Sequence, residues 1–143
     1  MRKRHYLMLF MAIFLVNGFF SQKVFDLTVN VTNLENNDGV LQFGLYNDAS
    51  KFPKVGETFK MVRVKTTGNS RKYTFKNLPQ GSYAVAIYQD ANNNDNCDKN
   101  FLGVPIEAFA FSNDVRPILS VPKFKDCSIL LNRSKTINIK LVY

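Results

Sequence analysis

A short acidic stretch holds the residues of this chain best suited to bind a cation. Oxygen-bearing side chains stand at relative positions 1, 3, 5 and 9 of the segment 90–98, namely Asp90, Asn92, Asn94 and Asp98. A tightly curled backbone turns such alternate side chains toward one centre, as at the start of a calcium loop. With the backbone carbonyl of Asn96 and water, they approach the roughly six to eight oxygens that calcium takes. The spacing therefore predicts a calcium site.

The segment departs from a full calcium loop at two positions. Asp95 stands where the sharp turn normally has glycine, although Asp tolerates left-handed backbone better than most residues. Phe101 stands where the pattern has a bidentate Glu, so a distal ligand such as Glu107 is needed. With few carboxylates, the expected affinity lies in the weak extracellular range, about 10⁻⁴–10⁻³ M. The alternative is an Asx-rich turn whose side chains satisfy their own backbone.

A second conspicuous stretch, 100–114, carries three aromatic residues close to the acidic loop: Phe101, Phe109 and Phe111. Together with Glu107 they could line a groove for a ligand. Aromatic residues in a long loop more often pin that loop to the body of the domain by packing. We favour packing and keep the ligand groove as the alternative.

The composition excludes several classes of enzyme. The one histidine, His5, lies within residues 1–21, which have the features of a secretory signal peptide. The mature chain therefore lacks the histidine of Ser-His-Asp and Cys-His catalysis and of ordinary zinc or copper sites. The sequence has no phosphate-binding loop and no dinucleotide fingerprint. We predict a binding or structural module without catalytic residues. The alternatives are a carboxylate-dependent extracellular hydrolase acting on a glycan and a carrier of an apolar ligand.

Residues 1–21 predict a secretory signal peptide. A basic start at 2–4 precedes an apolar run at 6–16, which is shorter than the roughly 20 residues of a membrane span. We expect cleavage near Ser21, with an uncleaved anchor as the alternative. Residues 22–143 would then form a single exported domain with no transmembrane segment, in the periplasm, at the cell surface or in the medium. An extracellular protein or a glycan is the kind of partner this location suggests.

The net charge of the mature chain bears on its partners. The chain has 19 Lys and Arg against 11 Asp and Glu, and removing the signal leaves 16 against 11, a net charge of +5. These basic residues are scattered along predicted strands, whereas a nucleic-acid binder clusters them, so nucleic acid is not an expected partner.

The mature chain has two cysteines, and an even number invites a disulfide in an oxidising compartment. Cys97 and Cys127 either form this disulfide or remain two thiols.

Alternation of apolar and polar residues dominates the mature chain and predicts short β-strands. We expect strands near 27–32, 41–45, 58–66, 73–75, 83–88, 128–131 and 136–142. The turn at 35–39 predicts a hairpin of the first two strands, and the fifth strand, apolar on both faces, is expected at the centre of a sheet. A helical turn is expected at most in 105–111. The pattern predicts an all-β fold, an antiparallel Ig-like or transthyretin-like β-sandwich of about seven strands.

Four motifs resemble a family of secreted bacterial proteins known as domain of unknown function 2141. They are LPQGSYAVA at 78–86, DANNN at 90–94, NFLGVP at 100–105 and FSN at 111–113, and the resemblance extends over 27–143. The Leu-Pro-x-Gly-x-Tyr turn is similar to that of transthyretin-like and carboxypeptidase-regulatory-like sandwiches, which implies the same architecture. The family usually has Gly at the position of Asp95, and membership implies no established activity. Transthyretin-like hydrolases depend on histidines that the mature chain lacks.

Overall fold

The computed structural model describes residues 22–103, 105–117 and 120–143, so the predicted signal peptide at 1–21 lies outside the described residues. Almost all of the regular structure is β. The strands are β1 (Val24–Thr32), β2 (Val40–Tyr46), β3 (Lys60–Lys65), β4 (Ser70–Pro79), β5 (Gly81–Asp90), β6 (Phe109–Phe111), β7 (Ile129–Leu131) and β8 (Lys135–Lys140). A 3-10 helix η2 (Ser112–Asp114) and a short helix α2 (Phe124–Cys127) follow β6. In this described part of the chain, no helix has the length and apolar character needed to cross a membrane.

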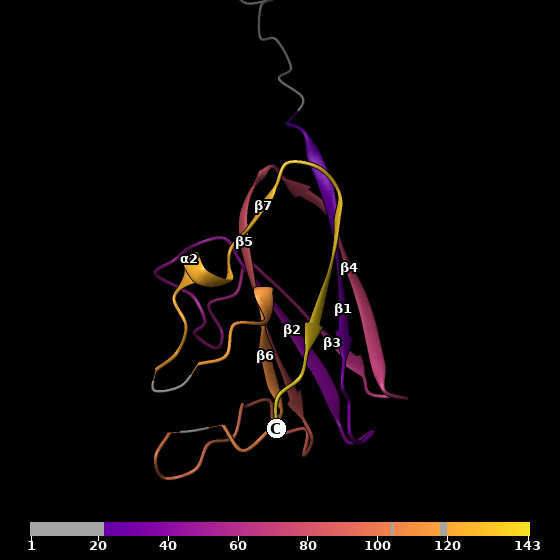
Figure 1. The fold of residues 1–143 in the computed structure, drawn as a ribbon, viewed down its shortest axis with the longest axis vertical. Coiled ribbons are helices and arrows are strands. Elements are labelled where there is room, and N and C mark those ends of the chain that lie inside the picture. Colours follow the sequence, from indigo (N-terminus) through magenta and orange to yellow (C-terminus); the bar gives the residue numbers. More distant parts are fainter. Residues whose placement is uncertain (1–21, 104, 118–119) are drawn as a thin grey trace, which may run out of the picture.

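The strands form two sheets that enclose one main core (Figure 1). The smaller sheet has the order β4-β1-β8, and the larger one has the order β3-β2-β5-β6, with β7 pairing farther along β5. β1 and β8 run parallel, and the other paired strands run antiparallel. The predicted all-β sandwich is confirmed, with this one parallel pair added.

The predicted hairpin of the first two strands is wrong. β1 pairs with β4 and β8, whereas β2 pairs with β3 and β5, so the segment 33–39 crosses from one sheet to the other. Both strands nevertheless bury one face in the same core, with Leu27, Val29 and Val31 on β1 and Leu41, Phe43 and Leu45 on β2. Alternation shows which face of a strand is buried, but not which strand lies beside it. A strand facing β1 across the core has the same pattern as a hairpin partner.

β5 is a central strand, as its two apolar faces predict. Tyr83, Val85 and Ile87 point into the main core, so the alternate residues point to the outer face of the larger sheet. There a second apolar cluster forms from Tyr46, Phe52, Ala84, Phe111 and Cys127. Phe52 and Cys127 of this cluster come from the connections at 47–59 and 115–128. The described residues of these connections lie on the side of β5 and β6 away from β1 and β4 (Figure 1). The outer face is therefore covered by loops.

Ser112 completes the hydrogen bonding of β5 where its partner strand changes. β5 pairs with β7 over 81–83 and with β6 over 86–88. Between these stretches the Val85 N–H donates to Ser112 Oγ at 2.9 Å, and the same hydroxyl donates to the Cys127 carbonyl at 2.5 Å. The helical turn expected within 105–111 is not formed, because residues 109–111 pair with β5 as β6 and the helical turn η2 starts only at Ser112.

Candidate functional site

The acidic loop 90–98 begins where β5 ends, and its first residue holds the turn in place. Asp90 is fully buried. Its Oδ1 accepts the N–H of Asn94 at 3.0 Å, and its Oδ2 accepts the N–H of Asp95 at 2.9 Å. Asn93 and Asp95 have left-handed backbone, with φ of 59° and 69°. Asp95 thus takes the conformation for which glycine is usual, because Asp pays a smaller steric penalty there than most residues.

Asp98 is the carboxylate at the far end of the loop. Asn92 Nδ2 donates to its Oδ2 at 2.7 Å, and Asn94 Nδ2 lies 3.0 Å from both of its oxygens. The side-chain oxygens of the two asparagines accept loop N–H groups, Asn92 from Asn94 and Asn94 from Asn96. Asn96 itself is exposed, and its amide donates to the Asn94 carbonyl at 2.9 Å. The side chains of Asn92, Asn94 and Asp98 therefore meet, but the asparagines turn their Nδ2 groups toward Asp98 and their oxygens toward loop N–H groups.

Glu107 reaches the same loop from the long segment that follows it. Its Oε1 accepts the N–H of Ala91 at 3.0 Å, and its Oε2 accepts the N–H of Asp98 at 3.1 Å. The Ile106 N–H also donates to the Asp98 carbonyl at 2.9 Å. One distal carboxylate thus joins the beginning and the end of the loop.

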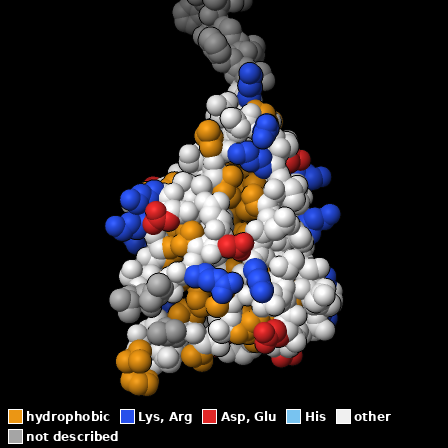
Figure 2. Space-filling model, in the orientation of Figure 1, with side chains coloured by type: hydrophobic (Ala, Val, Ile, Leu, Met, Phe, Trp, Pro, Cys, Tyr) orange, Lys and Arg blue, Asp and Glu red, His pale blue; other side chains and the backbone are white. Residues whose placement is uncertain are grey.

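Arg63 fastens the loop to the sheet, a role that the sequence did not reveal. The strand register places Arg63, Gln42 and Tyr88 in one row across β3, β2 and β5. Arg63 Nε donates to Gln42 Oε1 at 3.1 Å, and its Nη1 forms an ion pair with Asp95. In the sequence Arg63 is one of many basic residues on outward positions, and Figure 2 shows such side chains spread over the visible face. Only the register, which the sequence does not specify, separates Arg63 from the others.

The loop has oxygen atoms that could bind a cation, but it has few negatively charged side chains. The carboxylates are Asp90, Asp98 and Glu107, and the neighbouring amides are Asn92 and Asn94. Across the described ranges, no group of three or more His, Cys, Asp and Glu residues is placed to hold a metal ion. Amide and backbone oxygens would therefore have to supply much of a coordination shell. A carboxylate offers about four lone-pair sites, so one that accepts an N–H can still face a cation.

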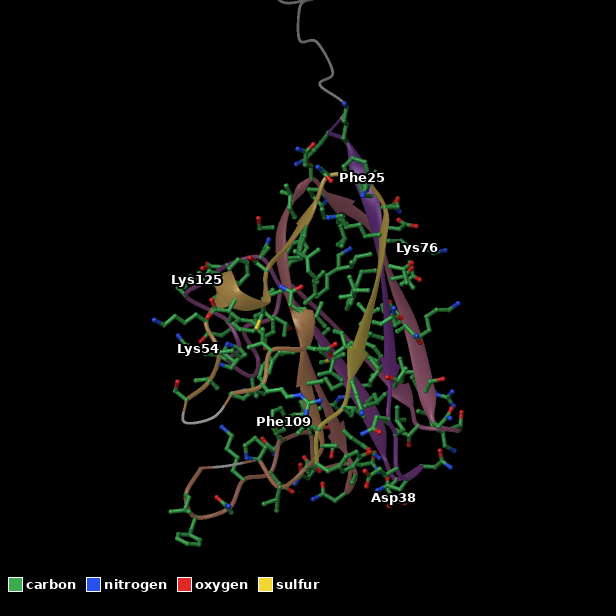
Figure 3. The ribbon with its side chains drawn as sticks, viewed as in Figure 1. Phe25, Asp38, Lys54, Lys76, Phe109 and Lys125 are labelled. Atoms are coloured by element: carbon green, nitrogen blue, oxygen red, sulfur yellow. The ribbon has the colours of Figure 1, made fainter. Side chains whose placement is uncertain are left out.

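The three phenylalanines of the long segment do not behave alike. Phe111 is buried and contacts Phe52, with ring centroids 5.9 Å apart. Phe109, the first residue of β6, is half-buried and packs against the same cluster (Figure 3). For Phe101 the predicted packing is wrong, because its side chain is 95% exposed. A turn closed by the Gly103 N–H and the Asn100 carbonyl, 2.9 Å apart, carries Phe101 out to the tip.

The two cysteines are free thiols in the structure. Cys127 is fully buried beside the middle of β5, where its carbonyl and the Val85 N–H share the hydroxyl of Ser112. Cys97 is half-buried in the loop that follows Asp90. Of the two alternatives that the sequence leaves open, the structure therefore has two thiols and no Cys97–Cys127 disulfide.

We expect a thiol reagent such as Ellman's reagent to label Cys127 slowly in the folded protein and rapidly after unfolding. Burial, with the negative charge of Asp126 beside it, raises the pKa of the Cys127 thiol from 9.0 to about 11, and the thiolate is the reactive form.

The same shift makes stability depend on pH. The Cys127 thiol ionises at a lower pH in the unfolded chain than in the folded one, so the free energy of unfolding should fall as the pH rises from 9 to 11. Urea titrations of wild type and Cys127→Ala at several pH values test this. An identical pH dependence in both proteins would contradict it.

These features define a class of protein: a two-sheet β-sandwich whose central strand runs directly into an acidic, amide-rich loop closed by a distal carboxylate. The chain belongs to the family described as "Uncharacterized protein conserved in bacteria (DUF2141)", whose family model matches residues 29–139. Neither a curated protein nor a solved structure matches the chain significantly. The membership expected from the four motifs is thereby confirmed.

Proposed function

We propose that this protein is an exported binding module, not an enzyme, and that its 90–98 loop with Glu107 binds calcium. The observation that carries this proposal is the position of Glu107, whose two carboxylate oxygens lie 3.0 Å and 3.1 Å from N–H groups at opposite ends of the loop. The sequence supplies oxygens at positions 1, 3, 5 and 9 but lacks a carboxylate at position 12. Glu107 is placed to fill that role.

The distribution of charge supports a cation at this loop. Asp95 has its own ion-pair partner in Arg63. Asp90, Asp98 and Glu107 form no ion pair with any residue of the described part of the chain. All three carboxylates contact the loop, so a divalent cation bound there would supply the positive charge that no ion-pair partner supplies.

The same contacts support binding over catalysis. A glycosidase needs two carboxylates that are free to reach a glycosidic bond. Asp90 is fully buried and accepts two backbone N–H groups, and both oxygens of Glu107 also accept backbone N–H groups. We therefore place the carboxylates in a structural calcium loop that orders the segment 99–107.

Calcium is expected to bind with a Kd of about 10⁻⁴–10⁻³ M. At about 10 mM calcium, such a Kd raises the free energy of unfolding by about 1.4–2.7 kcal/mol, because only the folded loop gathers the ligands. Isothermal titration calorimetry measures the binding, and urea unfolding with calcium or with a chelator measures the stabilisation. No heat of binding together with no stabilisation at this concentration would contradict the proposal.

Matched variants separate a specific site from general charge screening. Asp98→Asn and Glu107→Gln should each remove most of the calcium stabilisation, since each takes away a charged ligand. Asp126→Asn makes the same change of charge on α2, where the carboxylate is exposed and lies away from the loop. It should keep the full calcium response. Equal losses in all three variants would indicate screening of the whole surface instead of a site.

A further inference from the structure

A cavity of about 550 Å³ lies on the outer face of the larger sheet, beneath the loops that cover it. Pockets for small molecules typically have volumes of roughly 300–1,000 Å³. The floor contains Gly44 on β2 and Ala86 on β5, which are register partners. Ala86 is also the register partner of Phe111 on β6. The space lies mainly above Ala86, because Thr58 and the Tyr46 ring would already lie 3.1 Å and 3.2 Å from a Cβ at Gly44. The aromatic residues around this floor form the walls.

Ala86 shows that the space above the floor is open. It lies in a central strand, between β2 and β6, where side chains are normally covered. Its neighbours Val85 and Ile87 are buried in the main core, but Ala86 is only half-buried. The loops cover this face as a roof over the sheet, with Cys97, Pro105 and Pro117 among the residues that line the cavity.

Tyr88 provides the polar group of the cavity. Its side chain lines the cavity and is only 8% exposed, and its hydroxyl is buried with no hydrogen-bond partner. Within the described residues, no other buried side-chain nitrogen or oxygen lacks a partner. A phenol hydroxyl can both donate and accept a hydrogen bond. A buried hydroxyl without a partner costs stability, and a bound molecule can supply the missing partner.

The lining also indicates the charge of the ligand. The ionisable side chains of opposite sign in the described lining are Asp98 and Lys99, so an anion or a cation would meet repulsion as well as attraction. Tyr46, Phe109 and Phe111 offer aromatic surfaces for a ring to pack against. We propose that this cavity binds a small, neutral, ring-bearing molecule that hydrogen-bonds to the Tyr88 hydroxyl. The floor and the aromatic walls contain no proposed calcium ligand, whereas Asp98 belongs both to the calcium loop and to the cavity lining.

The test uses N-phenyl-1-naphthylamine, a neutral aromatic amine that fluoresces in apolar surroundings and has one N–H to donate to Tyr88. Titration into the protein should give a saturable rise in fluorescence with one site per chain. Ala86→Leu should abolish this rise, because the leucine side chain fills the space above the floor. Ala49→Leu makes the same substitution at an exposed turn position outside the lining and should bind as wild type does. Equal binding by wild type and Ala86→Leu would overturn the proposal that this cavity binds the amine.

Tyr88→Phe tests the hydrogen bond between the Tyr88 hydroxyl and the ligand, because it removes the hydroxyl and keeps the shape of the ring. Loss of one hydrogen bond should weaken binding of the amine about fivefold. In the absence of the amine, the same variant should melt about 3 °C higher, because an unpartnered buried hydroxyl has been removed. A hydroxyl with a purely structural role would change the melting temperature in the opposite direction. Unchanged affinity in Tyr88→Phe would overturn the role of this hydroxyl in binding.

Discussion

Replacing Gly39 with alanine is expected to lower the free energy of unfolding by about 4 kcal/mol. Gly39 ends the crossing from β1 to β2 with a φ of 63°, and its backbone lies against the start of the acidic loop. A Cβ at this position would lie 1.8 Å from the Asp90 carbonyl oxygen and 2.8 Å from the Ala91 Cα. Both are backbone atoms, so no change of rotamer relieves the overlap. The crossing must move away from β5, which also strains the loop that Asp90 begins.

Gly68 is the matched control for this change. Its φ is 69°, nearly that of Gly39, but a Cβ there has nothing within 4 Å. Gly68→Ala therefore measures the cost of left-handed backbone alone, which is about 1 kcal/mol. Urea unfolding followed by circular dichroism gives both values. Equal losses in the two variants would mean that the close approach of residue 39 to residue 90 does not hold in solution.

The course of the chain within each strand was predictable because it depends on local pattern. Leu27, Val29 and Val31 alternate with polar residues, and a strand with one buried face follows from that alternation. The same holds for β5, whose two apolar faces predict a central strand. β6 escaped prediction, because three residues carry too little periodicity and their strand conformation comes from pairing with β5. Tertiary contacts determine the conformation of such short segments.

The candidate site also has features that follow from local sequence and features that depend on tertiary contacts. Asn92, Asn94 and Asp98 belong to one short loop, so their spacing alone predicts that their side chains lie close together, although the asparagines contact Asp98 through their Nδ2 groups. The ion pair of Arg63 with Asp95 depends on the register of β3 against β2 and β5. The cavity above Gly44 and Ala86 depends on the register as well. Neither follows from the sequence of one segment, since each requires strands that lie far apart along the chain to be placed side by side.

Asp90→Ala is expected to lower the free energy of unfolding by about 3 kcal/mol. The side chain is fully buried, and its two oxygens accept the N–H groups of Asn94 and Asp95. Asn94 has a second acceptor in Asn92 Oδ1, so the variant leaves mainly the Asp95 N–H without a partner. Loss of two charge-assisted hydrogen bonds and the cavity left by the carboxylate add to the cost. Urea unfolding in the presence of a chelator measures this cost without a contribution from calcium.

Asp90→Asn separates the hydrogen bonds from the charge. Its one amide oxygen can accept one of the two N–H groups, while its Nδ2 faces the other donor, so its stability should lie between those of wild type and Asp90→Ala. Calcium stabilisation should be lost in both variants, because each removes the buried charged ligand. Asp126→Ala, which removes an exposed carboxylate on α2, should change stability by less than about 0.5 kcal/mol. If Asp90→Ala also stays within that range, Asp90 does not hold the start of the loop, and the calcium site loses its deepest ligand.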